Sequence, residues 1–290
     1  MSPQLMAGIL QQLSGECWRM VSIPLILLPP SEGKSSGGKG RTLDIASLSF
    51  SSLNETRKRM IKDLIDANSK PEYALRLLGL KGNSLETAKL DNLSVENTLT
   101  KSAIERYTGV MFDAICYPTL TDAEKVNFNE SVFIMSGLFG MVRPMDMIPV
   151  YKLKMGAKLH NGKACSWIWK PLLTDIIAQE GRDRVIWDLL PVEHSAAWDP
   201  LGVNAATRFT VKFVQRRPDG NLKTVSHWSK TLKGALVRFL ISNAEKSGSV
   251  KTAMTLVSGF VHPEGYELSE EYTVESDSVT QLVFVRELVG

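Results

Sequence analysis

The chain has 290 residues, of which 43% are hydrophobic and 22% are charged, a composition that is typical of a globular protein and excludes a disordered one. Its formal net charge of +3 permits a nucleic-acid or phosphate partner but does not argue for one, because dedicated DNA-binding domains are usually more basic. The sequence contains no apolar run of about 18 residues or more, so we expect no transmembrane helix and no membrane partner.

Cysteine and histidine usage indicates a reducing compartment and no metal or cofactor site. Cys17, Cys116 and Cys165 are widely spaced and form no C-x-x-C pattern, which excludes a disulfide scaffold and favours the cytoplasm. The histidines are also scattered, and none of them forms a pair with metal-ligand spacing: His160, His194, His227 and His262.

The first predicted elements follow an unusual N-terminus. Residues 1–20 lack the basic and long apolar regions of a signal peptide. We expect an extension, with Met20 as a candidate start and a short surface helix as the alternative, before a single domain over residues 21–290. The first half of that domain is then predicted to contain a strand over 21–28, helices over 54–66 (capped by Asn54), from Pro71 to Gly79 and over 84–90 (capped by Ser84), and a helical stretch within 101–115.

The second half mixes strands with helices and contains a hairpin signal, Pro218-Asp219-Gly220. This mixture predicts an α+β fold, in which one compact domain has a mixed sheet surrounded by helices. The predicted elements are strands over 132–135, 184–189, 208–214, 222–226, 254–260 and 278–286, and helices over 166–179 and 230–244.

Residues 131–155 are the first candidate site. The predicted strand there runs into a glycine-containing turn that carries Arg143, Asp146, Tyr151 and Lys152. Loops at strand ends often hold reactive or ligand-binding groups. The alternative is a structural turn with an Arg–Asp ion pair.

Lys34 lies in a second candidate loop, in the stretch PPSEGKSSGGKG. This stretch is not a P-loop, because Leu28 stands where the first glycine of that motif belongs. Its Gly and Ser amides can still form an anion-binding nest. The alternative is a mobile surface loop.

Further cations occur in two predicted helical regions. Lys81 lies between Gly79 and Gly82, where a helix-hairpin-helix would grip a nucleic-acid phosphate, although an ordinary αα-corner also uses glycine. Lys230, Lys233 and Arg238 share one predicted helix. Lys230 near the helix start is unfavourable for the helix dipole unless an anion binds there, and a solvated helix face is the alternative.

A possible acid/base pair follows the strand predicted over 184–189. Asp188, Glu193 and His194 come at or just beyond its end, and a carboxylate beside an imidazole can transfer protons. Residues adjacent in sequence rarely face each other, so Glu193 is retained as the catalytic candidate.

Together these stretches resemble the YaaA-type peroxide-stress protein family. The resemblance is carried by the order and spacing of Ser136-Gly137-Leu138-Phe139-Gly140, Arg143-Pro144, Asp146, Pro149, Tyr151-Lys152-Leu153 and Met155-Gly156, with support from LLPPSEGK, Tyr107-Thr108-Gly109, Lys230, Lys233-Gly234, Arg238, Gly259-Phe260 and Gly265-Tyr266. It covers residues 21–288. The turn over 190–194 departs from the family pattern, which puts any family role of that turn in doubt.

The resemblance implies a cytoplasmic protein that responds to peroxide stress, binds DNA and limits iron-dependent oxidative damage. In that hypothesis the phosphate contacts come from the basic residues Lys34, Lys81, Arg143, Lys152, Lys230, Lys233 and Arg238. The alternative is an enzyme for a nucleotide-like or phosphorylated small molecule, in which Asp146, Tyr151 and Glu193 are catalytic. Direct iron binding ranks last.

Overall fold

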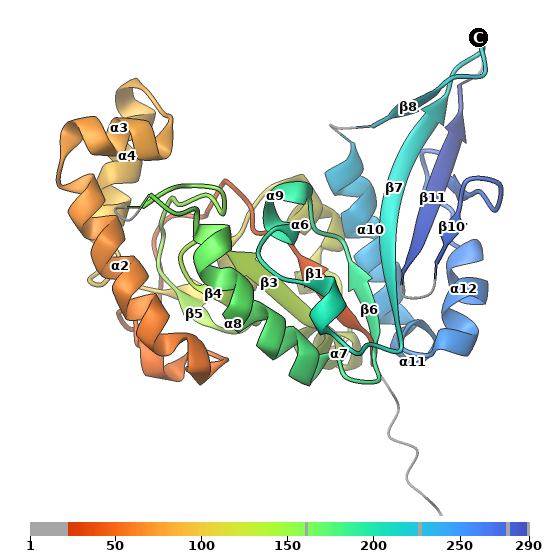
Figure 1. Cartoon of the computed structure of the whole chain (residues 1–290), viewed down its shortest axis with the longest axis horizontal. Helices are drawn as coiled ribbons and strands as arrows, with labels where there is room; N and C mark the ends of the chain where they lie inside the picture. Colours follow the sequence, from red (N-terminus) through yellow and green to blue (C-terminus); the bar gives the residue numbers. More distant parts are fainter. Residues whose placement is uncertain (1–22, 160–161, 226–227, 277–278, 289–290) are drawn as a thin grey trace, which may run out of the picture.

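The computed structural model describes residues 23–159, 162–225, 228–276 and 279–288, and its centre is a nine-stranded mixed β-sheet (Figure 1). Five neighbouring strands are parallel, in the spatial order β3 (Val132–Ser136), β1 (Leu25–Leu28), β6 (Val185–Asp188), β7 (Thr207–Arg216) and β11 (Thr280–Glu287). The antiparallel strands are β4 (Gly140–Val142), β8 (Leu222–Thr224), β9 (Glu267–Leu268) and β10 (Val274–Glu275). A separate antiparallel pair is formed by β2 (Lys101–Ser102) and β5 (Met147–Ile148).

The central strands form where the sequence is almost continuously apolar. Every residue of β1, β3 and β6 is buried, as expected for parallel strands covered on both faces. Each fully buried Leu, Ile or Val contributes about 1.5–3 kcal/mol to folding. The strands predicted at these places are confirmed, as is the β7–β8 hairpin, whose turn includes Gly220 at φ 82°.

Helices surround the sheet, and the expected α+β class with one compact domain is confirmed (Figure 1). The α-helices are α2 (Asn54–Asn68), α3 (Pro71–Leu78), α4 (Gly82–Leu93), α5 (Ala103–Arg106), α6 (Val110–Ile115), α7 (Asp122–Ser131), α8 (Cys165–Glu180), α9 (Val192–Ser195), α10 (Ser229–Ser242), α11 (Ala244–Ser247) and α12 (Val250–Ser258). Short 3-10 helices occupy Ile45–Ser47, Ser51–Leu53, Tyr117–Thr119 and Pro200–Gly202.

The close packing of α10 on α6 explains one of the glycines. A Cβ atom on Gly234 would lie 2.3 Å from the backbone oxygen of Met111. Any side chain at position 234 would therefore push the two helices apart. Gly234 of the Lys233-Gly234 pair is therefore required for the close contact between α10 and α6.

Three local predictions were wrong. The strand predicted over 254–260 is instead the end of helix α12, because Ala253 and Val257 are four residues apart and turn one helical face towards the core. Leu53 and Lys81 precede α2 and α4 at the N-cap positions predicted for Asn54 and Ser84. Asn54 lies inside its helix and accepts a hydrogen bond from Arg57.

Some expectations concern residues outside the described ranges. These are the N-terminal extension over 1–20, with Cys17 and Met20, and the histidines His160 and His227.

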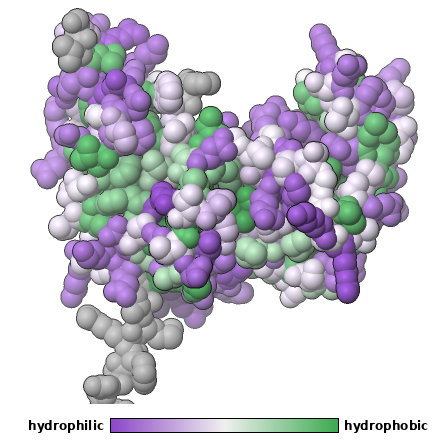
Figure 2. Space-filling view, turned by 180° about the vertical axis from the view of Figure 1, so that it is seen from behind, coloured by the Kyte–Doolittle hydropathy of each residue, from purple (hydrophilic) through white to green (hydrophobic). Residues whose placement is uncertain are grey.

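The molecule has two projecting lobes with a hollow edge between them. In Figure 1 one lobe is formed by α3 and α4, and the other by the far ends of β7 and β8. The space-filling view from behind shows the hollow between two largely hydrophilic lobes (Figure 2). The α3–α4 pair does not confirm a helix-hairpin-helix: Gly79 ends α3 at φ 62° and Gly82 already belongs to α4.

Candidate functional site

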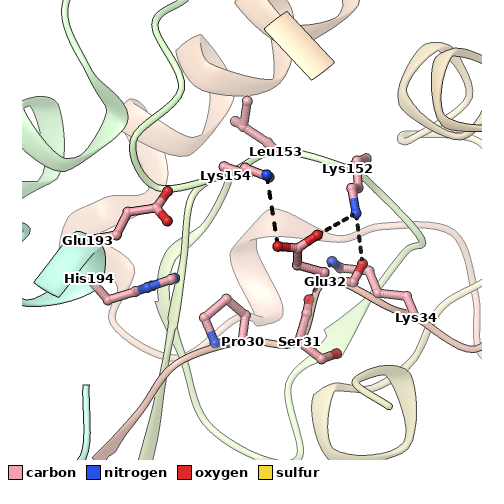
Figure 3. Close-up of a pocket in the computed structure, with 9 residues that line it drawn as sticks. All are labelled: Pro30, Ser31, Glu32, Lys34, Lys152, Leu153, Lys154, Glu193 and His194. Carbon is pink, nitrogen blue, oxygen red and sulfur yellow. Dashed lines mark hydrogen bonds and ion pairs between the residues drawn. The ribbon is translucent and has the colours of Figure 1, made fainter. Parts of the chain in front are cut away.

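A small cavity lies at the carboxyl edge of the parallel strands. We call it the cationic cavity, and it is lined by Pro30, Ser31, Glu32, Lys34, Lys152, Leu153, Lys154, Glu193 and His194 (Figure 3). Residues 30–34 lie in the loop after β1, and α9 begins four positions after the last residue of β6. From β1 the chain moves to β3 on one side and then returns to β6 on the other. Open α/β sheets bind ligands at such a switch of strand order.

Glu32 is held between two lysines of the cavity. Lys152 Nζ lies 3.4 Å from Glu32 Oε2 and donates to the Glu32 backbone oxygen at 3.3 Å. Lys154 Nζ lies 3.8 Å from Glu32 Oε1. Burial opposes the ionisation of Glu32, but Lys152, Lys154 and Lys230 outweigh burial and lower the pKa of its carboxyl. The cavity therefore holds a carboxylate where several positive charges converge (Figure 3).

Lys34 lies on an aromatic floor. Its Nζ is 4.3 Å from the ring centre of Tyr151 and 5.4 Å from that of Tyr107. Its hydrogen-bond acceptor is the backbone oxygen of Ser31, at 3.2 Å. Burial lowers the pKa of Lys34 to about 7, and the neighbouring Lys152 ammonium lowers it further than Glu32 raises it. The amine of Lys34 is thus poised near neutrality.

The floor is fixed by a buried hydroxyl chain. Tyr151 Oη lies 2.8 Å from both Ser136 Oγ and Tyr107 Oη. Ser136 Oγ also accepts the backbone N–H of Phe139, which ties the chain to the turn after β3. Burial raises the pKa of Tyr151 to about 12, so its hydroxyl is protonated at neutral pH. Tyr151 lies beneath Lys34, and its predicted catalytic role stays a prediction.

Glu193 and His194 lie on the wall opposite Lys34 and Lys152 (Figure 3). Glu193 Oε1 accepts the backbone N–H of Gly156 at 2.7 Å. Burial lowers the pKa of His194, Glu193 opposes part of this decrease and Lys230 adds to it, so the neutral imidazole is favoured at pH 7. Within the described ranges, the buried Nδ1 of His194 has no hydrogen-bond partner. A carboxylate and a neutral imidazole therefore face the amine of Lys34.

Arg143 and Asp146 are engaged in structural contacts and do not line the cavity. Asp146 is 7% exposed, and its carboxylate accepts hydrogen bonds from Ser49 N, Ser49 Oγ and Arg143 N at 2.7–3.0 Å. Arg143 Nη2 lies 3.1 Å from Glu180, and its guanidinium stacks on Phe133. The alternative interpretation of this turn placed an ion pair between Arg143 and Asp146; in the structure Asp146 Oδ2 instead accepts the backbone N–H of Arg143.

The basic residues of α10 make two kinds of interaction. Lys230 adds its charge near Glu32 and His194. Lys233 Nζ instead donates to Leu189 O at 2.8 Å. Arg238 Nη1 donates to Ile115 O and Cys116 O at the end of α6, and to Thr119 Oγ1. Both side chains therefore tie α10 to its neighbours.

Lys81 lies far from this set, in the exposed connection between α3 and α4. Of the predicted site residues, the cavity brings together Lys34, Lys152 and Glu193, with Tyr151 beneath and Lys230 nearby.

Two charged residues of the cavity, Glu32 and Lys154, were absent from the predicted set. The spacing of Glu32 and Lys34 in SEGK, and of Lys152 and Lys154, places the members of each pair on the same side of an extended segment. That signal was available in the sequence.

The described residues also lack two other kinds of feature. They contain no group of three or more His, Cys, Asp or Glu side chains that could hold a metal ion. None of their helices is long and apolar enough to cross a membrane.

The fold and the cavity define an α+β protein with a lysine-lined cavity at the carboxyl edge of the parallel strands of a mixed sheet. The chain belongs to the family described as peroxide stress protein YaaA, whose profile matches residues 25–271. This confirms the resemblance and associates the chain with peroxide stress.

Curated relatives agree with this membership. The chain is 34% identical to a UPF0246 protein of Streptomyces coelicolor over 85% of this chain and 92% of the relative. It is 35% identical to a UPF0246 protein of Corynebacterium efficiens over 81% and 92%. A UPF0246 protein of Corynebacterium glutamicum is 32% identical over 86% and 99%.

Proposed function

We propose that this protein supports survival under peroxide stress, in the cytoplasm, by binding a phosphorylated or nucleotide-like small molecule in the cationic cavity and acting on it as an enzyme. The observation that carries the proposal is the convergence of lysines around one carboxylate at the switch of strand order. Glu32 occupies the place that a ligand's phosphate or carboxylate would take. Charged donors around such an oxyanion are the usual means of holding it.

The polar groups on the opposite wall of the cavity favour a catalytic site over a surface that only binds phosphates. A surface that binds only a phosphate backbone needs cations. Here a carboxylate and a neutral imidazole, from Glu193 and His194, stand across from the lysines. Lys34 and His194, whose pKa values are lowered by burial, lie in the same cavity as this carboxylate, and such clusters are typical of an active site.

Thermal unfolding in the presence of inorganic phosphate, nucleotides and sugar phosphates tests this proposal. A ligand that binds the folded state at 100 times its Kd adds about 2.7 kcal/mol, which raises the Tm by roughly 5 °C for a chain of this size. Lys152→Ala should lose most of that rise, because it removes a positive charge that contacts Glu32.

Lys58→Ala is the matched control. Lys58 is exposed and pairs with Glu55 on its own helix, so this variant should respond to ligands as the unaltered protein does. Failure of every phosphorylated compound to stabilise the protein, or an unchanged response in Lys152→Ala, would contradict the proposal. Growth in hydrogen peroxide then links the cavity to protection, and Lys152→Ala should protect less than Lys58→Ala.

DNA binding that limits iron-dependent damage is the second candidate. What favours it is the hollow edge between the two hydrophilic lobes (Figure 2). The lysines of the cationic cavity also lie beyond the carboxyl ends of the parallel strands. Lys81 on the α3–α4 lobe would then reach a phosphate beyond the cavity. Contacts of this kind attract DNA of any sequence.

The salt dependence of duplex affinity tests this second candidate. The logarithm of the association constant should fall with the logarithm of salt concentration, with a slope of about −0.9 per phosphate contact. Lys81→Ala should weaken binding to all sequences alike and reduce the slope by about one contact, whereas Lys58→Ala should change neither. Duplex affinity that is insensitive to salt rules out this mode of binding.

A further inference from the structure

The amine of Lys34 differs from the other lysines that line the cavity. Lys152 and Lys154 both contact the carboxylate of Glu32. Among the described residues, no carboxylate forms an ion pair with Lys34. Its nitrogen instead lies over the ring of Tyr151 and donates to a backbone oxygen. A lysine that served only to hold an anion would be expected to be charged and exposed to it.

We propose that Lys34 is a nucleophile that forms an imine with an aldehyde or ketone carrying a phosphate or carboxylate group, an inference that rests on the proposed function because the same cavity holds the anion. Lysines become nucleophilic when they are desolvated or placed beside another cation. Lys34 meets both conditions: aromatic rings form its floor, and Lys152 lines the same small cavity.

The protonation state of Lys34 supports this role. Burial first, and the Lys152 ammonium second, lower its pKa to about 7. The tyrosine rings attract the protonated form and limit the decrease. About half of the Lys34 amine is therefore neutral at pH 7, whereas an ordinary exposed lysine is neutral in roughly one molecule in 2,500.

The reaction balances with the groups present. The nitrogen lone pair of neutral Lys34 attacks the carbonyl carbon, and the carbonyl oxygen takes up a proton to form a carbinolamine. The nitrogen gives up one of its protons at this stage. Its lone pair then forms a double bond to carbon as the C–O bond breaks, the hydroxyl leaves as water with a second proton, and the nitrogen gives up its remaining proton. One amine and one carbonyl yield one imine and one water, so no oxidant or reductant is needed. Glu193 and His194, on the opposite wall, can exchange these protons.

The anion of the substrate is expected to replace Glu32 between Lys152 and Lys154. This places its carbonyl group within the cavity, next to Lys34. The substrate class is therefore a short aldehyde or ketone with a terminal anionic group. An uncharged carbonyl compound lacks the group that the two lysines would hold.

Reductive trapping tests the inference. The full chain is incubated with glycolaldehyde phosphate at pH 7.5, reduced with sodium cyanoborohydride, digested and analysed by peptide mass spectrometry. Lys34 should carry the label at least about tenfold more than exposed lysines such as Lys58, because its amine is largely neutral at this pH. Glycolaldehyde phosphate should label Lys34 more than uncharged glycolaldehyde does. Inorganic phosphate should reduce the labelling by glycolaldehyde phosphate, because it competes for the anion site.

Two variants separate chemistry from binding. Lys34→Arg keeps a cation but cannot form the imine, so labelling at position 34 should disappear while thermal stabilisation by phosphate persists. Lys152→Ala should reduce labelling by glycolaldehyde phosphate to the level of the uncharged aldehyde. Lys58→Ala should label like the unaltered protein.

The outcomes distinguish this inference from the proposed function. If phosphate stabilises the protein but Lys34 is labelled no more than Lys58, the imine role is overturned and the anion site stands. If neither labelling nor stabilisation occurs, both fall. In the unaltered protein, labelling of Lys34 that levels off above about pH 7 while labelling of Lys58 keeps rising to pH 8 supports the inference without any variant.

Discussion

Lys34→Met is expected to raise the free energy of unfolding by about 1–3 kcal/mol at pH 6. The buried amine of Lys34 has a pKa of about 7 in the folded protein, against about 10.4 in the unfolded chain. Below pH 7 the folded state must carry the ammonium in a desolvated place, which costs stability. The decrease in pKa sets an upper limit of about 5 kcal/mol on this loss of stability. Because Lys34 is partly exposed, the actual loss is smaller than that limit.

The sign of the pH dependence follows from proton binding. Between pH 7 and about pH 10 the unfolded chain binds more protons at Lys34 than the folded protein does, so the stability of the unaltered protein rises with pH. Methionine does not titrate. The advantage of Lys34→Met should therefore be largest below pH 7 and decrease as the pH rises towards 10.

Urea denaturation of both proteins at pH 6, 7, 8 and 9 measures the difference between their free energies of unfolding. The contributions of the other titrating groups largely cancel in that difference. Lys58→Met is the matched control, because Lys58 is exposed, and its difference should stay within about 0.5 kcal/mol at every pH. A difference for Lys34→Met that does not vary with pH would show that Lys34 is an ordinary charged lysine.

Asp146→Ala is expected to lower the free energy of unfolding by about 3 kcal/mol. Its carboxylate accepts three hydrogen bonds, from both the backbone and the hydroxyl of Ser49 and from the backbone of Arg143. Hydrogen bonds to a charged group contribute about 1.5–3 kcal/mol each, and buried donors left without a partner add a cost of their own. The Tm should fall by roughly 5 °C.

Thermal and urea unfolding measure this loss, with Asp66→Ala as the control. Asp66 is exposed on α2, and its replacement should change stability by less than about 0.5 kcal/mol. The alternative role is catalytic. An Asp146→Ala protein that unfolds like the unaltered protein but fails to protect cells from peroxide would assign Asp146 to the chemistry and contradict the structural account.

The elements that could be predicted are those whose signal is local. The apolar runs of β1, β3 and β6 and the turn before β8 need no knowledge of the rest of the chain. Helix α7 escaped prediction although its capping box, Thr121 and Glu124, is also local. The region of α12 was misassigned because a short apolar run fits a strand or a helix equally well until its packing is known.

The candidate site was less predictable because its members come from separate parts of the chain. Lys34, Lys152 and Glu193 were candidates, and the fold brings them to one cavity. Lys233 and Arg238 were candidates on the same grounds, but they bind backbone oxygens instead. A positive charge in the sequence does not reveal whether its partner will be a carbonyl oxygen, a carboxylate or a ligand.

The sequence by itself determined the α+β class, the core strands and the family, because apolar runs and ordered motifs are properties of the chain as written. Only the tertiary structure decided which polar residues meet. The parallel order β3-β1-β6 places the loops after β1 and β6 together, and burial between them changes the chemistry of Lys34. Desolvation and charge proximity act through space, so no pattern along the chain contains them.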